Sequence, residues 1–117
     1  MSSVIVFDEE MDSCNLLKRI LEREGHGVTT CSHSEETLRL VSSNPPDLVI
    51  AHISQSKSMK LAAQIKSVNS KLKVLTICDH VSDVVESAMG DGYLIRPVDI
   101  ETIESKVREL LAPEKRS

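Results

Sequence analysis

The sequence has almost no aromatic residues and no apolar run long enough to cross a membrane. Its 117 residues include one Tyr, one Phe and no Trp, and the formal net charge is −4. Nucleic-acid surfaces combine clustered Lys and Arg with rings that stack on bases, and both are missing here. A membrane-spanning helix needs about 20 consecutive apolar residues. We therefore expect neither a nucleic-acid partner nor a membrane for this domain, and protein partners instead.

Cysteine is also scarce, with three residues, an odd count, in the chain. The N-terminus shows no secretory leader, so we expect free thiols in the reducing cytoplasm. The chain is long enough to bury a core without disulfides or metals as supports. We expect one domain over residues 1–112, followed by a charged tail at 113–117 that is either a frayed end or the start of a linker.

Short apolar segments alternate with amphipathic ones along the chain. Strict alternation of strands and helices predicts right-handed crossovers and a five-stranded parallel sheet with helices on both faces, an α/β fold. Ligands and partners of such sheets meet the carboxyl ends of the strands. The predicted strands are 4–7, 26–31, 46–53, 72–78 and 93–97, and the predicted helices are 11–24, 34–41, 61–68, 82–89 and 100–111. In the last helix, the residues expected to face inward are Ile100, Ile103, Val107, Leu110 and Leu111.

These pieces resemble the receiver domain of two-component response regulators over nearly the whole chain. The family's first strand ends in an acidic pair, where this sequence has Asp8-Glu9-Glu10. Its third strand reads Pro-Asp-Leu-Val before the phosphoacceptor aspartate, and Pro46-Asp47-Leu48-Val49-Ile50-Ala51 here leads to His52. Its fifth strand carries an aromatic and then Lys-Pro, where Tyr93-Leu94-Ile95-Arg96-Pro97 stands here. The resemblance implies a CheY-like, flavodoxin-like doubly wound sheet with strand order 2-1-3-4-5.

Three positions depart from the family's active-site pattern. His52 replaces the phosphoacceptor, Cys78 stands where the fourth strand ends in Thr or Ser, and Arg96 replaces the lysine. The loop after the third strand lacks the usual proline and glycine, and the segment from Cys78 to Arg96 is about one helical turn short. We therefore expect a pseudo-receiver: a non-enzymatic module for protein interaction in two-component-type signalling that does not depend on phosphorylation.

The acidic residues have two interpretations. In an active receiver two such carboxylates and the phosphoacceptor bind magnesium, a hard cation that prefers oxygen ligands. With His52 in the third position we expect weak or absent magnesium and no cofactor; alternatively Asp8, Glu9 and His52, with Cys78, form a mixed-ligand metal site. In the simpler interpretation Asp8 and Glu9 cap the first helix. Arg96 either reaches these carboxylates in bidentate fashion and replaces the magnesium charge, or faces solvent.

The remaining candidates each carry a structural alternative. His52 is either a phosphotransfer residue or a buried histidine that hydrogen-bonds a neighbour. Cys78 is either a redox thiol activated by Arg96 or a buried, inert one. Cys14 and Cys31 suit packing positions, and His80 lacks a second ligand pair at metal-binding spacing.

Tyr93 holds the place of the family's switch aromatic. Without a phosphoacceptor we expect it to be a fixed part of a binding face. The predicted partner surface therefore combines the fourth helix, 82–89, the fifth strand and the last helix. The partner is either another protein or an effector domain downstream, and the sequence leaves a homodimer open.

Overall fold

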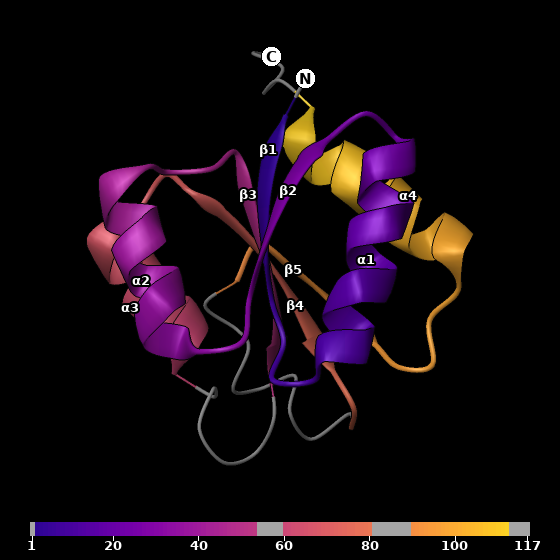
Figure 1. The fold of residues 1–117 in the computed structure, drawn as a ribbon, viewed down its shortest axis with the longest axis horizontal. Helices are drawn as coiled ribbons and strands as arrows, with labels where there is room; N and C mark the ends of the chain where they lie inside the picture. Colours follow the sequence, from indigo (N-terminus) through magenta and orange to yellow (C-terminus); the bar gives the residue numbers. More distant parts are fainter. Residues whose placement is uncertain (1, 54–59, 81–89, 113–117) are drawn as a thin grey trace.

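A parallel sheet lies between two layers of helices (Figure 1). The structure is a computed structural model that describes residues 2–53, 60–80 and 90–112. The sheet has five strands in the order β2-β1-β3-β4-β5, which confirms the predicted α/β, flavodoxin-like topology. The strands are β1 Ser3–Phe7, β2 Gly27–Cys31, β3 Leu48–Ile53, β4 Lys73–Cys78 and β5 Gly92–Ile95. The helices of the described ranges are α1 Met11–Arg23, α2 Ser34–Ser43, α3 Leu61–Val68 and α4 Ile100–Leu111.

Each face of the sheet carries its own hydrophobic core. Helices α1 and α4 pack on one face, and α2 and α3 pack on the other (Figure 1). The central strands β1, β3 and β4 read as nearly continuous apolar runs because both of their faces are covered. Along β3, Val49 points into one core and Ile50 into the other, as the two-residue period of a strand requires.

Some sequence predictions need correction at this level. Ile100, expected to face inward, is 45% exposed at the first position of α4, while Ile103 and Val107 of the same helix are buried. Leu16, one of the apolar residues at helical spacing in the predicted helix 11–24, is 56% exposed, while its neighbour Leu17 takes the core position. The third strand begins at Leu48 and not at Pro46, since proline has no N–H to donate to a ladder.

Two predicted segments lie outside the residues that the structure describes. The fourth predicted helix, 82–89, and the tail, 113–117, lie outside the described residues. The predicted last helix is therefore the element labelled α4. None of the helices within the described ranges is long and apolar enough to span a membrane.

The ends of two helices are fixed by particular residues. Asp99 caps α4, because its Oδ1 accepts a hydrogen bond from the Thr102 N–H at 2.7 Å. Gly25 follows α1 with φ of 91°, a conformation in which a side chain would be strained. Asp before a helix and Gly after one are residue types that commonly occupy these positions.

Candidate functional site

The register of the sheet brings four polar residues to one edge. Phe7 pairs with Ala51, so Asp8 and His52 follow on neighbouring strands. Cys78 pairs with Ile53 on one side and with Ile95 on the other, so Asp79 and Arg96 follow on the next two strands. The carboxyl ends of β1, β3, β4 and β5 thus present an acid, an imidazole, an acid and a guanidinium together, where a parallel sheet places its sites.

His52 is held from both sides of its ring. Its Nδ1 lies 3.3 Å from Asp8 Oδ1, and its Nε2 lies 3.0 Å from Asp79 Oδ2. The side chains of His52 and Asp8 are 8% and 2% exposed, so this pair is shielded from water. Asp8 Oδ1 also accepts a hydrogen bond from the Glu10 N–H at 2.9 Å, which ties the acid to the start of α1. The imidazole is therefore fixed in orientation by contacts at both nitrogens.

Arg96 completes the network from β5. Its Nε donates to Asp79 Oδ1 at 2.9 Å, while the other oxygen of the same carboxylate faces His52. Its Nη1 donates to Ser13 Oγ on α1 at 3.3 Å, and its Nη2 lies 2.9 Å from His52 Nε2. One guanidinium thus connects three elements, which the rigid fork of arginine allows and a lysine ammonium would not. We call Asp8, Ser13, His52, Asp79 and Arg96 the His52 network.

The Nε2 atom of His52 has two neighbours of opposite kind: a hydrogen-bond acceptor on Asp79 and a donor on Arg96. When Nε2 carries a hydrogen, it donates to Asp79; when it carries none, it accepts from Arg96 Nη2. In the doubly protonated ring both nitrogens donate to carboxylates, Asp8 at one end and Asp79 at the other. The charged imidazole then balances two acids together with one guanidinium, and the neutral ring leaves one negative charge in excess.

The pKa of His52 is raised above its ordinary value of 6.5. The hydrogen bond to Asp8 is the largest cause; burial and the Arg96 charge oppose it, and the Asp8 charge and the Asp79 hydrogen bond add to it. At Asp79 burial raises the pKa, but hydrogen bonds and charges from Arg96 and His52 outweigh burial and bring the pKa below 3.8. The network therefore favours a charged imidazole between charged partners.

The structure separates the other candidates from this network. Glu9 is exposed and lines a different depression with Met11 and His33. Cys78 is completely buried at the end of β4, and its backbone carbonyl accepts from the Arg96 N–H at 2.8 Å. Of the two interpretations of Cys78, the burial fits the inert thiol, because a reactive thiol needs solvent access. Cys14 and Cys31 are buried too, and burial raises the pKa of both thiols.

Two members of the network were missed by sequence reasoning, and one pairing was wrong. The sequence left two alternatives for Arg96, a pairing with Asp8 and Glu9 or a position facing solvent, but its carboxylate partner is Asp79. Asp79 follows the strand next to β5, so its carboxylate lies closer to the arginine than β1 does. The acid directly after the fourth strand was the available signal. Ser13 gave no signal, since a serine inside a helix is ordinary.

The residues present do not fit a magnesium ion. Asp8 Oδ1 is occupied by His52 and the Glu10 N–H, and the residue on β3 offers nitrogen where magnesium prefers oxygen. Asp79 is bound by Arg96, a cation already in place. Across residues 2–53, 60–80 and 90–112, no three His, Cys, Asp or Glu side chains are grouped so as to hold a metal.

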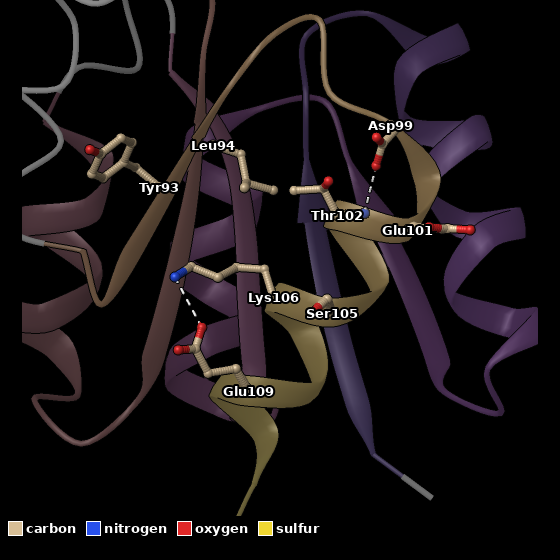
Figure 2. A pocket seen from close by; sticks show the side chains of 8 residues that line it. All are labelled: Tyr93, Leu94, Asp99, Glu101, Thr102, Ser105, Lys106 and Glu109. Carbon is tan, nitrogen blue, oxygen red and sulfur yellow. Dashed lines mark hydrogen bonds and ion pairs between the residues drawn. The ribbon is translucent and has the colours of Figure 1, made fainter.

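A second feature lies beside the sheet edge, between β5 and α4. Tyr93 is 49% exposed and borders a depression of about 510 Å³ whose other wall is the exposed side of α4 (Figure 2). We call this depression the β5–α4 groove. Its lining residues are Tyr93, Leu94, Asp99, Glu101, Thr102, Ser105, Lys106 and Glu109.

Comparison with known proteins gives relatives along nearly the whole chain. Response regulator MprA from Mycobacterium sp. (strain MCS) is 29% identical over 114 residues, 92% of this chain and 50% of that protein. The transcriptional regulatory protein PhoP for alkaline phosphatase synthesis from Bacillus subtilis is 25% identical, covering 92% of this chain and 48% of its own length. The chain therefore spans about half the length of these curated relatives.

Solved structures agree with the sheet order and the helix layers. The response regulator protein TrrA from Thermotoga maritima, in complex with Mg(2+)-BeF, superimposes with a TM-score of 0.86 at 25% identity, covering 94% of this chain and 99% of that one. A CheY-like receiver domain protein from Methanospirillum hungatei gives the same TM-score at 20% identity. The response regulator receiver domain family matches residues 4–108. The chain belongs to the response regulator receiver domain family.

Proposed function

We propose that this receiver domain signals without phosphorylation, as a module that binds another protein. The observation that carries the proposal is the His52 ring, which stands on β3 where the resemblance places the phosphoacceptor and is held at both nitrogens by acids. An imidazole cannot form the acyl phosphate that an aspartate forms. The position that would receive the signal in other receivers here forms part of a structural network.

The same contacts weigh against the alternative, a phosphotransfer site on His52. A nucleophilic nitrogen needs a free lone pair that faces the donor. In the network Nδ1 faces Asp8, and Nε2 faces both Asp79 and Arg96. Protonation, which the raised pKa of His52 favours, removes the remaining lone pair. Two carboxylates would also repel an incoming phosphate. The other alternative, a metal site on these residues, lacks a suitable set of ligands.

Arg96 supports a fixed state of the domain. It supplies a permanent positive charge at the edge of the sheet and links β5 to β4 through Asp79 and to α1 through Ser13. A guanidinium stays charged at all physiological pH values, so a change of pH in that range does not remove the positive charge of this link. We infer that β5, with Tyr93 on it, keeps one conformation for a partner.

The partner surface is proposed on β5 and α4, together with the segment 82–89, which lies outside the described residues. Tyr93 offers an exposed ring there, a common anchor of protein interfaces. The partner is either an effector domain of the same protein, since the curated relatives are about twice as long as this chain, or a separate protein. The domain itself would catalyse no reaction.

Incubation with acetyl phosphate and magnesium tests the proposal. We expect the intact mass to stay unchanged, while a phosphorylatable receiver in the same buffer gains one phosphoryl group. His52→Gln serves as the control that identifies label on that side chain. Acid-labile label that disappears in this variant would replace the proposal with a phosphohistidine function.

A further inference from the structure

The β5–α4 groove has a charge pattern that selects its occupant. Three carboxylates line it, from Asp99, Glu101 and Glu109, against the single ammonium of Lys106 (Figure 2). Lys106 already pairs with Glu109 at 3.0 Å. Within the described part of the chain, no ion pair involves Asp99 or Glu101. The groove therefore carries a net charge of about −2 that its own residues leave uncompensated.

The acids of the groove are held in place by the helix. Asp99 caps α4, and its hydrogen bonds with Thr102 lower the pKa of its carboxyl below 3.8, so it is charged at neutral pH. Glu101 is exposed in the first turn of the same helix. Both lie near the end of α4 that leads back to β5, while Glu109 lies two turns further along (Figure 2). A bound chain would meet negative charge at both ends of the groove.

The floor and the other wall are apolar and aromatic. Leu94 lies at the floor at 9% exposure, and Tyr93 stands with its ring half-exposed on β5. The stem of Lys106 crosses toward the strand, since Gly92 has no side chain: a Cβ there would lie 3.0 Å from Lys106 Cε. The ring lies on the β5 side of the groove and the carboxylates lie on the α4 side (Figure 2), so Lys or Arg side chains of a partner could contact the ring on one side and a carboxylate on the other.

A second copy of this chain fits the groove poorly. A two-fold dimer with its axis through the groove would place the acidic groove of one copy against that of the other, and like charges across an interface cost free energy. A different chain with Lys or Arg at matching spacing would gain at the same positions. The charge pattern thus favours a different protein as the partner over the homodimer that the sequence left open.

We propose that the β5–α4 groove binds a cationic peptide segment of another protein, with an apolar residue over Leu94 and a Lys or Arg between Tyr93 and the acids of α4. This inference rests on the proposed function, since it names the kind of partner for the same face. It adds the sign of the partner's charge and the groove residues that would contact the charged side chain.

Panning a random dodecapeptide library on the whole chain tests this inference. We expect the enriched peptides to carry net positive charge around an apolar residue. Synthetic copies, measured by fluorescence anisotropy, should bind roughly fivefold more weakly to Glu101→Gln/Glu109→Gln, because two surface ion pairs with the peptide are lost. Asp99 is left intact so that α4 keeps its cap. Raising the salt concentration should weaken binding to the wild type more than to the variant.

The matched control is Glu35→Gln/Glu36→Gln, which removes the same charge from exposed positions on α2, across the sheet. It should bind the peptides as the wild type does. The inference is overturned if no cationic sequence is enriched, or if the peptides bind the groove variant and the control equally well. If the peptides bind elsewhere on the domain, the proposed phosphorylation-independent binding of another protein still holds. If the domain is phosphorylated, that proposed function is wrong, whatever the groove binds.

Discussion

Asp8→Asn tests whether the buried charge beside His52 holds the imidazole in its protonated form. The change keeps the shape of the side chain, and its Oδ1 still accepts from the Glu10 N–H, which lies 2.9 Å away in the wild type. What disappears is the negative charge 3.3 Å from His52 Nδ1. Because the hydrogen bond to Asp8 is the main cause of the raised pKa of His52, we expect that pKa to fall in the variant.

The effect on stability has a defined sign. The folded pKa of His52 lies above its unfolded value near 6.5, so the stabilisation is complete below that value and is lost as pH rises through the folded pKa. At about pH 5.5 the pair contributes fully, and at about pH 9, well above the unfolded value, it contributes less. Asp79 does not interfere there, because its folded pKa is below 3.8 and its contribution is lost only as pH falls through that lower value.

The magnitude follows from the geometry of the pair. Hydrogen bonds to charged groups contribute about 1.5–3 kcal/mol. The 3.3 Å separation is longer than the usual charged N–H···O distance, so we expect the lower end, about 1.5 kcal/mol at pH 5.5. In urea this coupling corresponds to a midpoint difference of about 1 M for a domain of this size.

A double-mutant cycle measures the coupling directly. The variants are Asp8→Asn, His52→Gln and their combination, unfolded in urea at both pH values, with the imidazole titration followed by NMR. His52→Gln also identifies the resonance, since it removes one of the four histidines in the chain. A coupling near zero, the same coupling at both pH values, or an unchanged His52 pKa in Asp8→Asn would refute the reasoning.

Three further predictions concern the same region. Arg96→Lys should lower the melting temperature by about 3–5 °C, because an ammonium cannot replace the forked contacts to Asp79 and Ser13. The control Arg108→Lys, at an exposed position, should leave the melting temperature unchanged. Equal shifts in the two variants would contradict this prediction. His52→Asp should take up acetyl phosphate weakly at best, since Arg96 still occupies Asp79; full magnesium-dependent modification, seen by intact mass, would show a competent pocket. The three buried thiols should resist a disulfide reagent in buffer and react in urea, and a fast native thiol would contradict their burial.

Most of the fold could be predicted from the sequence, because buried parallel strands and amphipathic helices leave periodic apolar patterns. The run Leu48–Ile53 predicted a central strand, and the structure places it between β1 and β4. One exception lies at a helix end: Ile100 has a core-like residue type, but at the first position of α4 it is 45% exposed. Periodicity reports which residues share a face and does not report where that face stops being covered.

The candidate site was only partly predictable. His52 and Arg96 were identified from the resemblance to the receiver family, at the ends of two predicted strands that a parallel sheet brings to one edge. The partner of Arg96 was not, since the choice between Asp8 and Asp79 depends on the distance between strands and on side-chain reach, neither of which the sequence encodes locally. Ser13 joins the network through the way α1 packs on the sheet, a tertiary contact across 83 positions.

A titration with beryllofluoride and magnesium, followed in amide NMR spectra, tests the central claim most directly. Beryllofluoride stands in for a phosphoryl group on the acceptor aspartate of a receiver, and the similar TrrA structure holds it together with magnesium. We predict no new resonances for His52 and its neighbours in the network and no shift at Tyr93. A second set of resonances at the ends of β3 and β5, appearing in proportion to added beryllofluoride, would contradict a receiver that works without phosphorylation.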